Sequence, residues 1–312
     1  MRGIADEKES KNSGSDRYDI YAIRTTKADV AEFKENHAFY NLSGSQILVQ
    51  AVNEMYTPVA GSVWMGDELF GIPWETDAEI LCYIPSENSE YSPETFASWD
   101  AFFDVVEERG MDEVYRLMDI RVSVMLMEQY MARYCDVESS QYTFDTEEFR
   151  QVLRLIRRVK DMDLPQSISS GLATAGELFP AGLTFGWAEL SSYEKGQEIA
   201  IVYPSIAGEV GSVTAKQTYL VVNPNSNRKE EAIDYLEFIC QNPYVRQNVL
   251  LYPNESCPEI ADLLEHHLVY LTDSRVDMSE LFEIINAYCE GTLDEEETIH
   301  QITEKVEMQI CG

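Results

Sequence analysis

The hydrophobic and polar positions of the chain follow two different periods. Apolar residues recur at helical spacing through residues 99–109, 112–134 and 145–160, and again near the C-terminus. Between these segments lie short β-branched and aromatic runs that predict strands. The expected strands are YDIYAI (18–23), two strands within 68–84 around a Gly-Pro turn, LTFGW (183–187), IAIVYP (199–204) and TYLVVN (218–223). This alternation favours an α/β protein with two lobes joined by crossing segments.

Several helix boundaries carry local signals. Ser98 is expected to cap a helix that Gly110 ends. Asp145 stands three residues before Glu148, the spacing of a capping box. Asn227 precedes Glu230 in the same way. Apolar residues in register predict the buried faces of two helices, namely Phe149, Val152, Leu153, Ile156 and Val159 in one and Ile299, Ile302 and Val306 in the other. Residues 1–17 are polar and charged, and are expected to form a disordered tail.

Length and charge narrow the functional classes. A chain of 312 residues can bury more than one core. The 23 Lys and Arg against 56 Asp and Glu leave a net charge of −33, which repels phosphate backbones and anionic lipid head groups. Nucleic-acid binding and a peripheral membrane role are therefore disfavoured. Cys82, Cys240 and Cys289 lie among apolar neighbours and are expected in the core, and a bridge from Cys240 to Cys257 is the alternative for one of them.

The residues that could carry chemistry form no reactive constellation. Ser192 and Lys195 have the S-x-x-K spacing, but the companion motifs of that enzyme class are absent. Glu265, His266 and His267 lack the spacing that stacks two imidazoles on one helical face. No Walker loop, G-x-G-x-x-G or nucleophile elbow occurs. We therefore expect a binding protein without a catalytic site, metal or cofactor.

The tryptophans are more informative, because aromatic faces hold sugars and other amphipathic solutes. Trp99 begins a helix among apolar neighbours and is expected in the core. Trp74 follows the Gly-Ile-Pro turn, and Trp187 ends a strand after Gly186. Trp74 and Trp187 could each face a cleft or lie in the core, and the sequence does not decide between these positions.

Six segments, in order, resemble the family 1 extracellular solute-binding proteins of ABC importers, especially the carbohydrate-type, lipoprotein-like members. The resemblance extends from about residue 17 to 310. Its segments are YDIYAI, MYTPVAGSVWMGDELFGIPWETDAEILCYI, ETFASWDAFFDVVEERG, FDTEEFRQVLRLIRRV, YLVVNPNSNRKEEAIDYLEFIC and AYCEGTLDEEETIHQITEKVEMQI.

The resemblance implies a periplasmic-binding-protein-like, type II fold with two lobes that enclose a solute and close around it. The solute is expected to be a sugar or oligosaccharide before a peptide or polyamine, delivered to an importer permease by a monomeric protein at the cell surface, lipid-anchored or extracellular. Carried over to the loops after the matched strands, the ligand-binding residues would be Arg24, Thr25, Trp74, Glu75, Thr76, Trp187 and Tyr203.

The chain departs from the family pattern at its start. Members begin with a signal peptide, a lipid-anchored cysteine and a β-α-β unit before the strand that YDIYAI resembles, and this sequence shows none of these. The N-terminal lobe is therefore expected to be incomplete, and a truncated, non-transporting remnant or interaction module is the alternative function. The expected organisation is a partial N-lobe (18–84), a mainly C-lobe part with hinge crossings (85–222) and C-terminal helices packing on both lobes (223–312).

Overall fold

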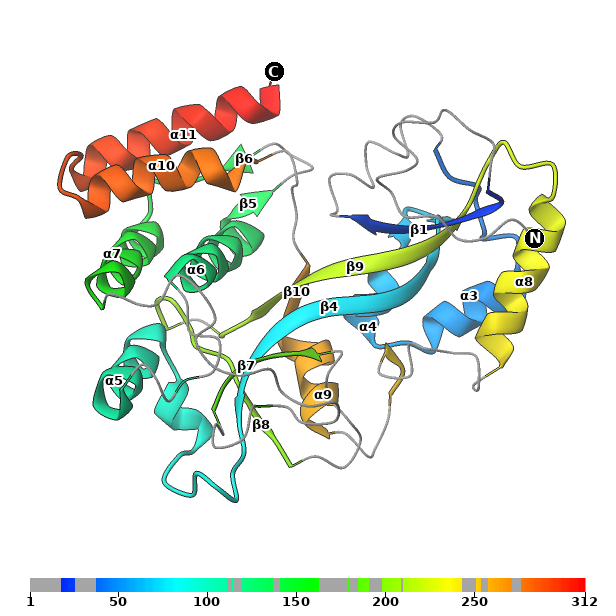
Figure 1. Cartoon of the computed structure of the whole chain (residues 1–312). Coiled ribbons are helices and arrows are strands. Elements are labelled where there is room, and N and C mark those ends of the chain that lie inside the picture. The colour runs from blue at the N-terminus through cyan, green and yellow to red at the C-terminus, as the bar shows by residue number, and fades with distance from the viewer. Residues whose placement is uncertain are drawn as a thin grey trace. The chain divides into compact units, whose positions relative to one another are not determined.

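The computed structural model divides the chain into two compact units (Figure 1). Unit 1 comprises the described residues up to Asp77 together with Ala215–Leu268, and unit 2 comprises Ala78–Thr214 and the described residues from Val269 onward. The structure describes residues 18–25, 38–110, 114, 119–136, 141–162, 179, 185–190, 198–208, 210–242, 251–253, 258–270 and 276–311. The expected disordered tail, the Ser192–Lys195 pair and Cys257 lie outside these residues.

The unit boundaries differ from the expected domain limits. The chain passes from unit 1 to unit 2 after Asp77, within a continuous strand, rather than at residue 84. Residues 215–222 belong to unit 1 instead of the mainly C-lobe part. The C-terminal helices are divided after Leu268 between the two units. A crossing inside a strand carries no turn or linker composition, so the sequence has no local signal of its position.

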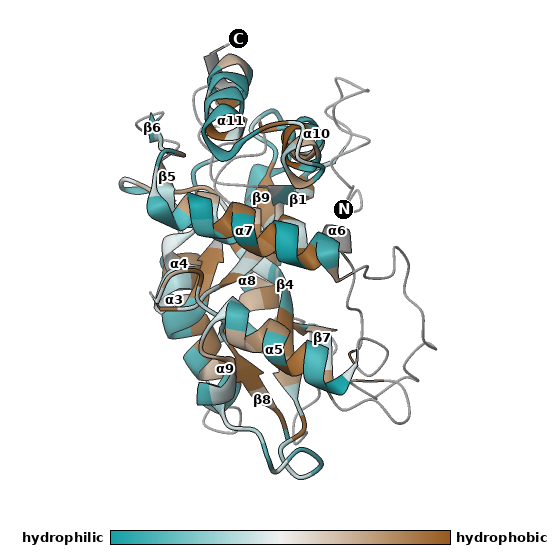
Figure 2. Cartoon of the chain, turned by 90° about the vertical axis from the view of Figure 1, so that its left-hand side faces the viewer, coloured by the Kyte–Doolittle hydropathy of each residue, from teal (hydrophilic) through white to brown (hydrophobic). Residues whose placement is uncertain are grey.

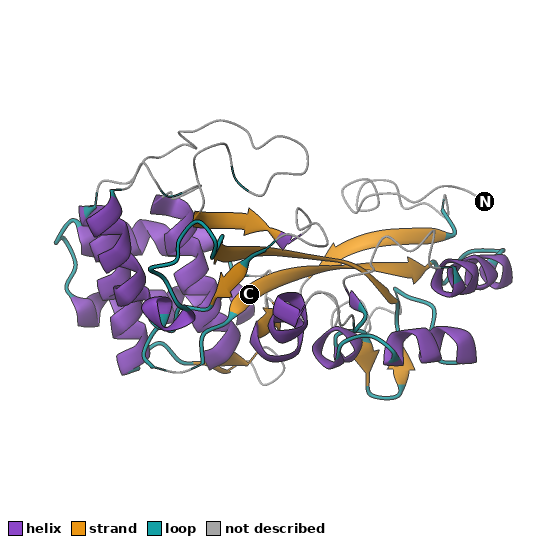
Figure 3. Ribbon diagram, turned by 90° about the horizontal axis from the view of Figure 1, so that it is seen from below, coloured by secondary structure: helices purple, strands orange, loops and turns teal. Residues whose placement is uncertain are grey.

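Strands are the orange arrows of Figure 3, and the longest strands of the main sheet are β4 and β9. The order is β1-β9-β4-β7, with β10 paired to β9 and β8 paired to β4. The bounds are β1 Ile20–Thr25, β4 Ile72–Tyr83, β7 Phe185–Glu189, β8 Ala200–Val202, β9 Val213–Val222 and β10 Leu268–Tyr270. β1 runs antiparallel to β9, and β7 and β8 run antiparallel to β4. The strands predicted at 18–23, 183–187, 199–204 and 218–223 are confirmed, although β9 begins five residues earlier than expected.

Unit 1 also contains helices and a small two-stranded hairpin. Their bounds are α3 Gln46–Asn53, α4 Thr57–Gly61, β2 Trp64–Met65, β3 Glu68–Leu69, α8 Lys229–Gln241, α9 Pro258–Asp262 and a π-helical turn, Leu263–His267. The Ser45 hydroxyl accepts the Leu48 N–H at 3.2 Å and donates to the Glu237 carboxylate at 2.6 Å, so one cap joins α3 to α8. α8 begins after Arg228 without a side-chain cap, so the expected Asn227 capping box is wrong.

Unit 2 is built mainly from helices packed on one another. The bounds are a 3-10 turn Pro93–Phe96, α5 Trp99–Arg109, α6 Asp119–Tyr134, β5 Cys135–Asp136, β6 Gln141–Tyr142, α7 Glu147–Asp161, α10 Met278–Cys289 and α11 Glu295–Cys311. α6 packs on α7, and α10 packs on both α7 and α11. The expected caps of α5 are confirmed, because Ser98 accepts the Ala101 N–H and Gly110 ends the helix at φ 96°. At α7 the cap is Thr146, which accepts the Phe149 N–H at 3.1 Å, rather than Asp145.

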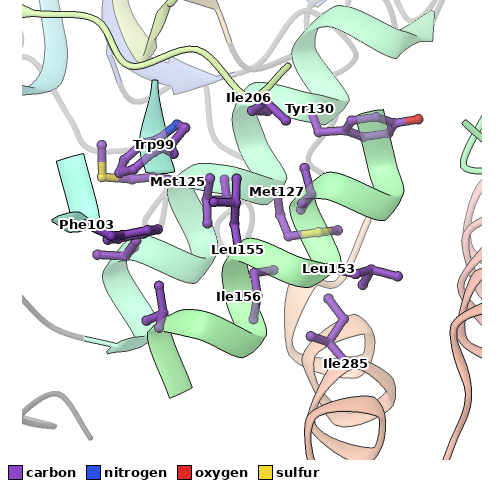
Figure 4. Packing of buried hydrophobic residues seen from close by; sticks show 14 of the residues in the cluster. Trp99, Phe103, Met125, Met127, Tyr130, Leu153, Leu155, Ile156, Ile206 and Ile285 are labelled. Carbon is purple, nitrogen blue, oxygen red and sulfur yellow. The ribbon is translucent and has the colours of Figure 1, made fainter. Parts of the chain in front are cut away.

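The core of unit 2 is aromatic and aliphatic (Figure 4). Trp99 and Phe103 from α5 lie beside Leu155 and Ile156 from α7 and Met125 from α6. The residues predicted to be buried on α7 and α11 are confirmed. The opposite face of α7 is hydrophilic (Figure 2). Its arginines Arg150, Arg154 and Arg158 pair with carboxylates at Asp145, Glu147, Asp100, Asp104, Glu107, Glu295 and Glu296.

The three cysteines expected in the core differ in burial. Cys82 is fully buried, and burial raises the pKa of its thiol, which keeps it uncharged. Cys240 is also buried, whereas Cys289 is half-buried.

Among the described residues, no helix combines the length and the apolar character needed to cross a membrane.

Candidate functional site in unit 1

Polar side chains gather on one face of three neighbouring strands of unit 1. Arg24, on β1, lies opposite Thr218 on β9 and forms an ion pair with Asp77 on β4. Glu75 is exposed two residues before Asp77 on the same strand. Because side chains of a strand alternate between its faces, Glu75 and Asp77 share one face. We call Arg24, Glu75, Asp77 and Thr218 the unit 1 polar face.

The predicted trio Trp74, Glu75 and Thr76 is divided by this alternation. These residues were expected in a loop after the Gly-Ile-Pro turn, but β4 continues unbroken through them from Ile72 to Tyr83. Glu75 is therefore exposed on one face, while Thr76 is buried and Trp74 half-buried on the other. Consecutive residues of one strand cannot all face the same solute, so Trp74 and Thr76 are not part of the unit 1 polar face.

Thr76 has a structural partner that the sequence reasoning missed. Its hydroxyl donates to the side-chain oxygen of Gln217 at 2.6 Å, and Gln217 is fully buried on β9. The inside positions of β9 alternate as Val213, Ala215, Gln217 and Tyr219. An amide at an otherwise apolar inside position is the signal that could have found Gln217, but the predicted strand began one residue after it.

Trp187 belongs to the core of unit 2. Its side chain is completely buried, and its ring stacks on Trp99 at a centroid distance of 6.4 Å and meets Phe102 edge-on at 5.2 Å. A buried ring presents no surface to a solute. The expectation that Trp187 binds ligand is therefore corrected to a core role, while the core position expected for Trp99 is confirmed.

The remaining two predicted ligand residues lie on different units. Thr25 ends β1 opposite Gln217, and its side chain is outside the described residues. Tyr203 is half-buried in unit 2, just after β8. Its carbonyl oxygen lies so close to Gly211 that a Cβ placed there would be only 1.7 Å away. Tyr203 is thus held by a backbone contact that only glycine permits.

Gly211→Ala should destabilise unit 2, because the added methyl group overlaps the Tyr203 carbonyl and forces the backbone apart. We expect a loss of about 3 kcal/mol in the free energy of unfolding, the upper part of the overpacking range. Chemical denaturation followed by circular dichroism measures it. Gly61→Ala is the matched control, since a Cβ at Gly61 meets nothing within 4 Å. Equal stabilities of the two variants would contradict the close contact.

The other residues with candidate chemistry do not assemble a site. Glu265 accepts the Thr57 N–H at 3.4 Å, and His267 lies 3.5 Å from Asp262. These contacts serve the packing of the π-helical turn. Within the described part of the chain, no group of three or more His, Cys, Asp or Glu side chains could hold a metal ion.

The unit 1 polar face suits the recognition of hydroxyl groups. A guanidinium supplies only donors, a carboxylate only acceptors, and a threonine hydroxyl both. Arg24 and Asp77 are 52% and 36% exposed, so their ion pair is a surface pair that contributes about 1 kcal/mol or less. Arg24 can therefore turn from Asp77 to a solute oxygen at small cost.

The chain resembles solved structures of binding proteins over nearly its whole length, although no protein-family model and no curated protein matches it. Maltose-bound MalE3 of T. maritima is 16% identical, with 96% of this chain and 86% of that chain covered and a TM-score of 0.66. For the sugar-binding protein MalE of Xanthomonas citri these values are 15%, 98%, 87% and 0.69. For an ABC transporter solute-binding protein of Thermotoga lettingae bound with α-D-tagatose they are 15%, 94%, 85% and 0.67. The chain thus has the two-lobe, type II α/β fold of the solute-binding proteins of ABC transporters.

Proposed function

We propose that the chain binds a small extracellular solute, a sugar or oligosaccharide, and hands it to an ABC importer. The observation that carries the proposal is the unit 1 polar face, which offers donors and acceptors on a sheet of this fold. Arg24 and Glu75 act on solute hydroxyls, Thr218 adds a hydroxyl, and Asp77 holds Arg24 when no solute is present. The described sugar ligands of the similar structures support the same solute class.

Binding rather than catalysis is the role proposed for this face. A hydrolytic site needs a nucleophile or a pair of carboxylates with separated pKa values beside a substrate. The polar face instead resembles a recognition surface, where placed polar groups fix orientation and specificity. The solved structures named above are binding proteins by their descriptions, which supports this assignment.

The proposed role implies a cellular location and a protein partner. A protein that delivers solute to an importer works outside the cytoplasmic membrane, free or attached to the cell surface, and contacts a permease. Lipid anchoring, the monomeric state and enclosure of the solute by two lobes stay predictions from the sequence.

A thermal-shift screen against sugars and peptides tests the proposal. A solute that binds only the folded chain adds about 2.7 kcal/mol of stability at a hundred times its dissociation constant. We therefore expect the melting temperature to rise by about 5 °C with at least one sugar, and to stay unchanged with peptides. No rise with any sugar would contradict the proposal and favour the interaction module. A rise with peptides alone would overturn the solute class.

A further inference from the structure

Gln217 occupies an unusual position for its side chain. It is fully buried on the inner face of β9, between Ala215 and Tyr219 in the alternating pattern. Burial also raises the pKa of Tyr219, two positions along the same face, to about 12, because a charged phenolate is disfavoured there. A polar amide is costly in such a place unless its groups are hydrogen-bonded.

Every polar group of this amide has a partner. The oxygen of Gln217 accepts the Thr76 hydroxyl at 2.6 Å. Its nitrogen donates to the backbone carbonyl of Glu75 at 2.8 Å and to that of Thr218 at 3.1 Å. Two of the three bonds therefore reach β4, and they hold two successive residues of that strand.

The hydrogen bonds of Gln217 join β9 to β4 next to the residues of the unit 1 polar face. Thr76 is the last residue but one of β4 in unit 1, and Gln217 is the third residue of β9 in that unit. The bond to the Glu75 carbonyl fixes the peptide that carries the Glu75 side chain, while that side chain extends from the opposite face. A displacement of this peptide would move the Glu75 side chain relative to Asp77, which shares its face of β4.

We infer that Gln217 is a positioning residue for solute recognition: from inside the sheet it holds the Glu75–Thr76 segment so that the unit 1 polar face keeps its geometry. The inference rests on the proposed function, because it treats Glu75 as a solute ligand. Gln217 itself does not touch solute. The bonds are specific, since an apolar residue at this position would fill the same space and leave the Thr76 hydroxyl and the Glu75 carbonyl without their partner.

Gln217→Met tests this inference, because methionine keeps the volume and removes the hydrogen bonds. The matched control is Gln129→Met. Gln129 is a buried glutamine in unit 2 that accepts the Trp99 indole N–H at 2.9 Å and donates to the Ser212 carbonyl at 2.7 Å. Both variants lose a bridging amide, but only Gln217 contacts the segment that bears Glu75.

Hydrogen exchange of the solute-free chain gives the first readout. We expect amide exchange across residues 72–77 to rise about tenfold in Gln217→Met and to match wild type in Gln129→Met. Solute affinity, measured below the melting temperature of each variant, gives the second. We expect about tenfold weaker binding for Gln217→Met only. Unchanged exchange across 72–77, or equal losses of affinity in the two variants, would overturn the inference.

Gln217→Glu supplies a readout that a purely packing role would not move. An ionised glutamate places a negative charge against the carbonyls of Glu75 and Thr218, whereas the protonated form can donate to one of them. We expect its affinity, divided by that of wild type at the same pH, to rise as the pH falls from 8 to 5. A constant ratio overturns the inference. If wild type binds no sugar while the exchange response remains, the proposed function fails and the positioning of the strand stands.

Discussion

Trp187→Ala is expected to lower the free energy of unfolding of unit 2 by about 3–5 kcal/mol, the cost of removing a large aromatic ring from a core. The ring is completely buried and packs against Trp99 and Phe102, so its removal leaves a cavity that rigid neighbours cannot fill. Denaturant unfolding followed by circular dichroism measures the loss, with each unit's transition fitted separately if the two do not coincide.

Trp187→Phe is the matched control, because it keeps most of the ring volume. Among the described residues the Trp187 indole N–H has no hydrogen-bond acceptor, so the phenylalanine loses no such bond. We expect it to cost less than Trp187→Ala, about 2 kcal/mol, because the smaller ring leaves a smaller cavity. A solvent-facing ligand residue would behave in the opposite way: Trp187→Ala would leave stability within about 1 kcal/mol of wild type. That result would contradict the core assignment.

Glu75→Gln and Arg24→Met are expected to weaken sugar binding by about 10–100-fold each. A hydrogen bond to a charged group contributes about 1.5–3 kcal/mol, and 1.4 kcal/mol corresponds to a factor of ten in affinity. Both side chains are exposed on the unit 1 polar face, so their loss should leave the fold intact. Titration calorimetry with the sugar that most raises the melting temperature measures the change.

Glu230→Gln controls for the change in net charge that Glu75→Gln makes, because Glu230 is an exposed glutamate of unit 1 in the first turn of α8. It should bind sugar with wild-type affinity. If Glu75→Gln and Arg24→Met also bind like wild type, the unit 1 polar face is not the solute site. If Glu230→Gln weakens binding as much as Glu75→Gln does, the effect of removing a glutamate charge is one of overall charge and the proposed Glu75 contact is wrong.

The positions of helices and strands could be predicted from the sequence better than the face of the sheet on which each side chain lies. Hydrophobic spacing located α5, α7 and α11, and β-branched runs located β1, β7, β8 and β9, because these signals are local. The predicted turn within 68–84 did place a break before Ile72, but it did not reveal that β4 then runs for twelve residues. As a result, three consecutive residues were assigned to one site although strand alternation separates them.

Long-range contacts explain what the sequence could not show. Whether Trp187 faced a cleft or the core depended on Trp99 and Phe102, which lie more than 80 positions away in the chain. The role of Gln217 similarly depends on its hydrogen bonds to Thr76 and Glu75 on another strand. The pairing of Arg24 with Asp77 depends on β9 lying between β1 and β4, and no local pattern encodes that order.

Calorimetric titration of the intact, folded chain with the sugars of the thermal-shift screen measures sugar binding directly. We expect saturable binding of one sugar per chain, weakened by Glu75→Gln and unaffected by Glu230→Gln. Absence of saturable heat with every sugar, in a chain that circular dichroism shows to be folded, would contradict sugar binding by this chain.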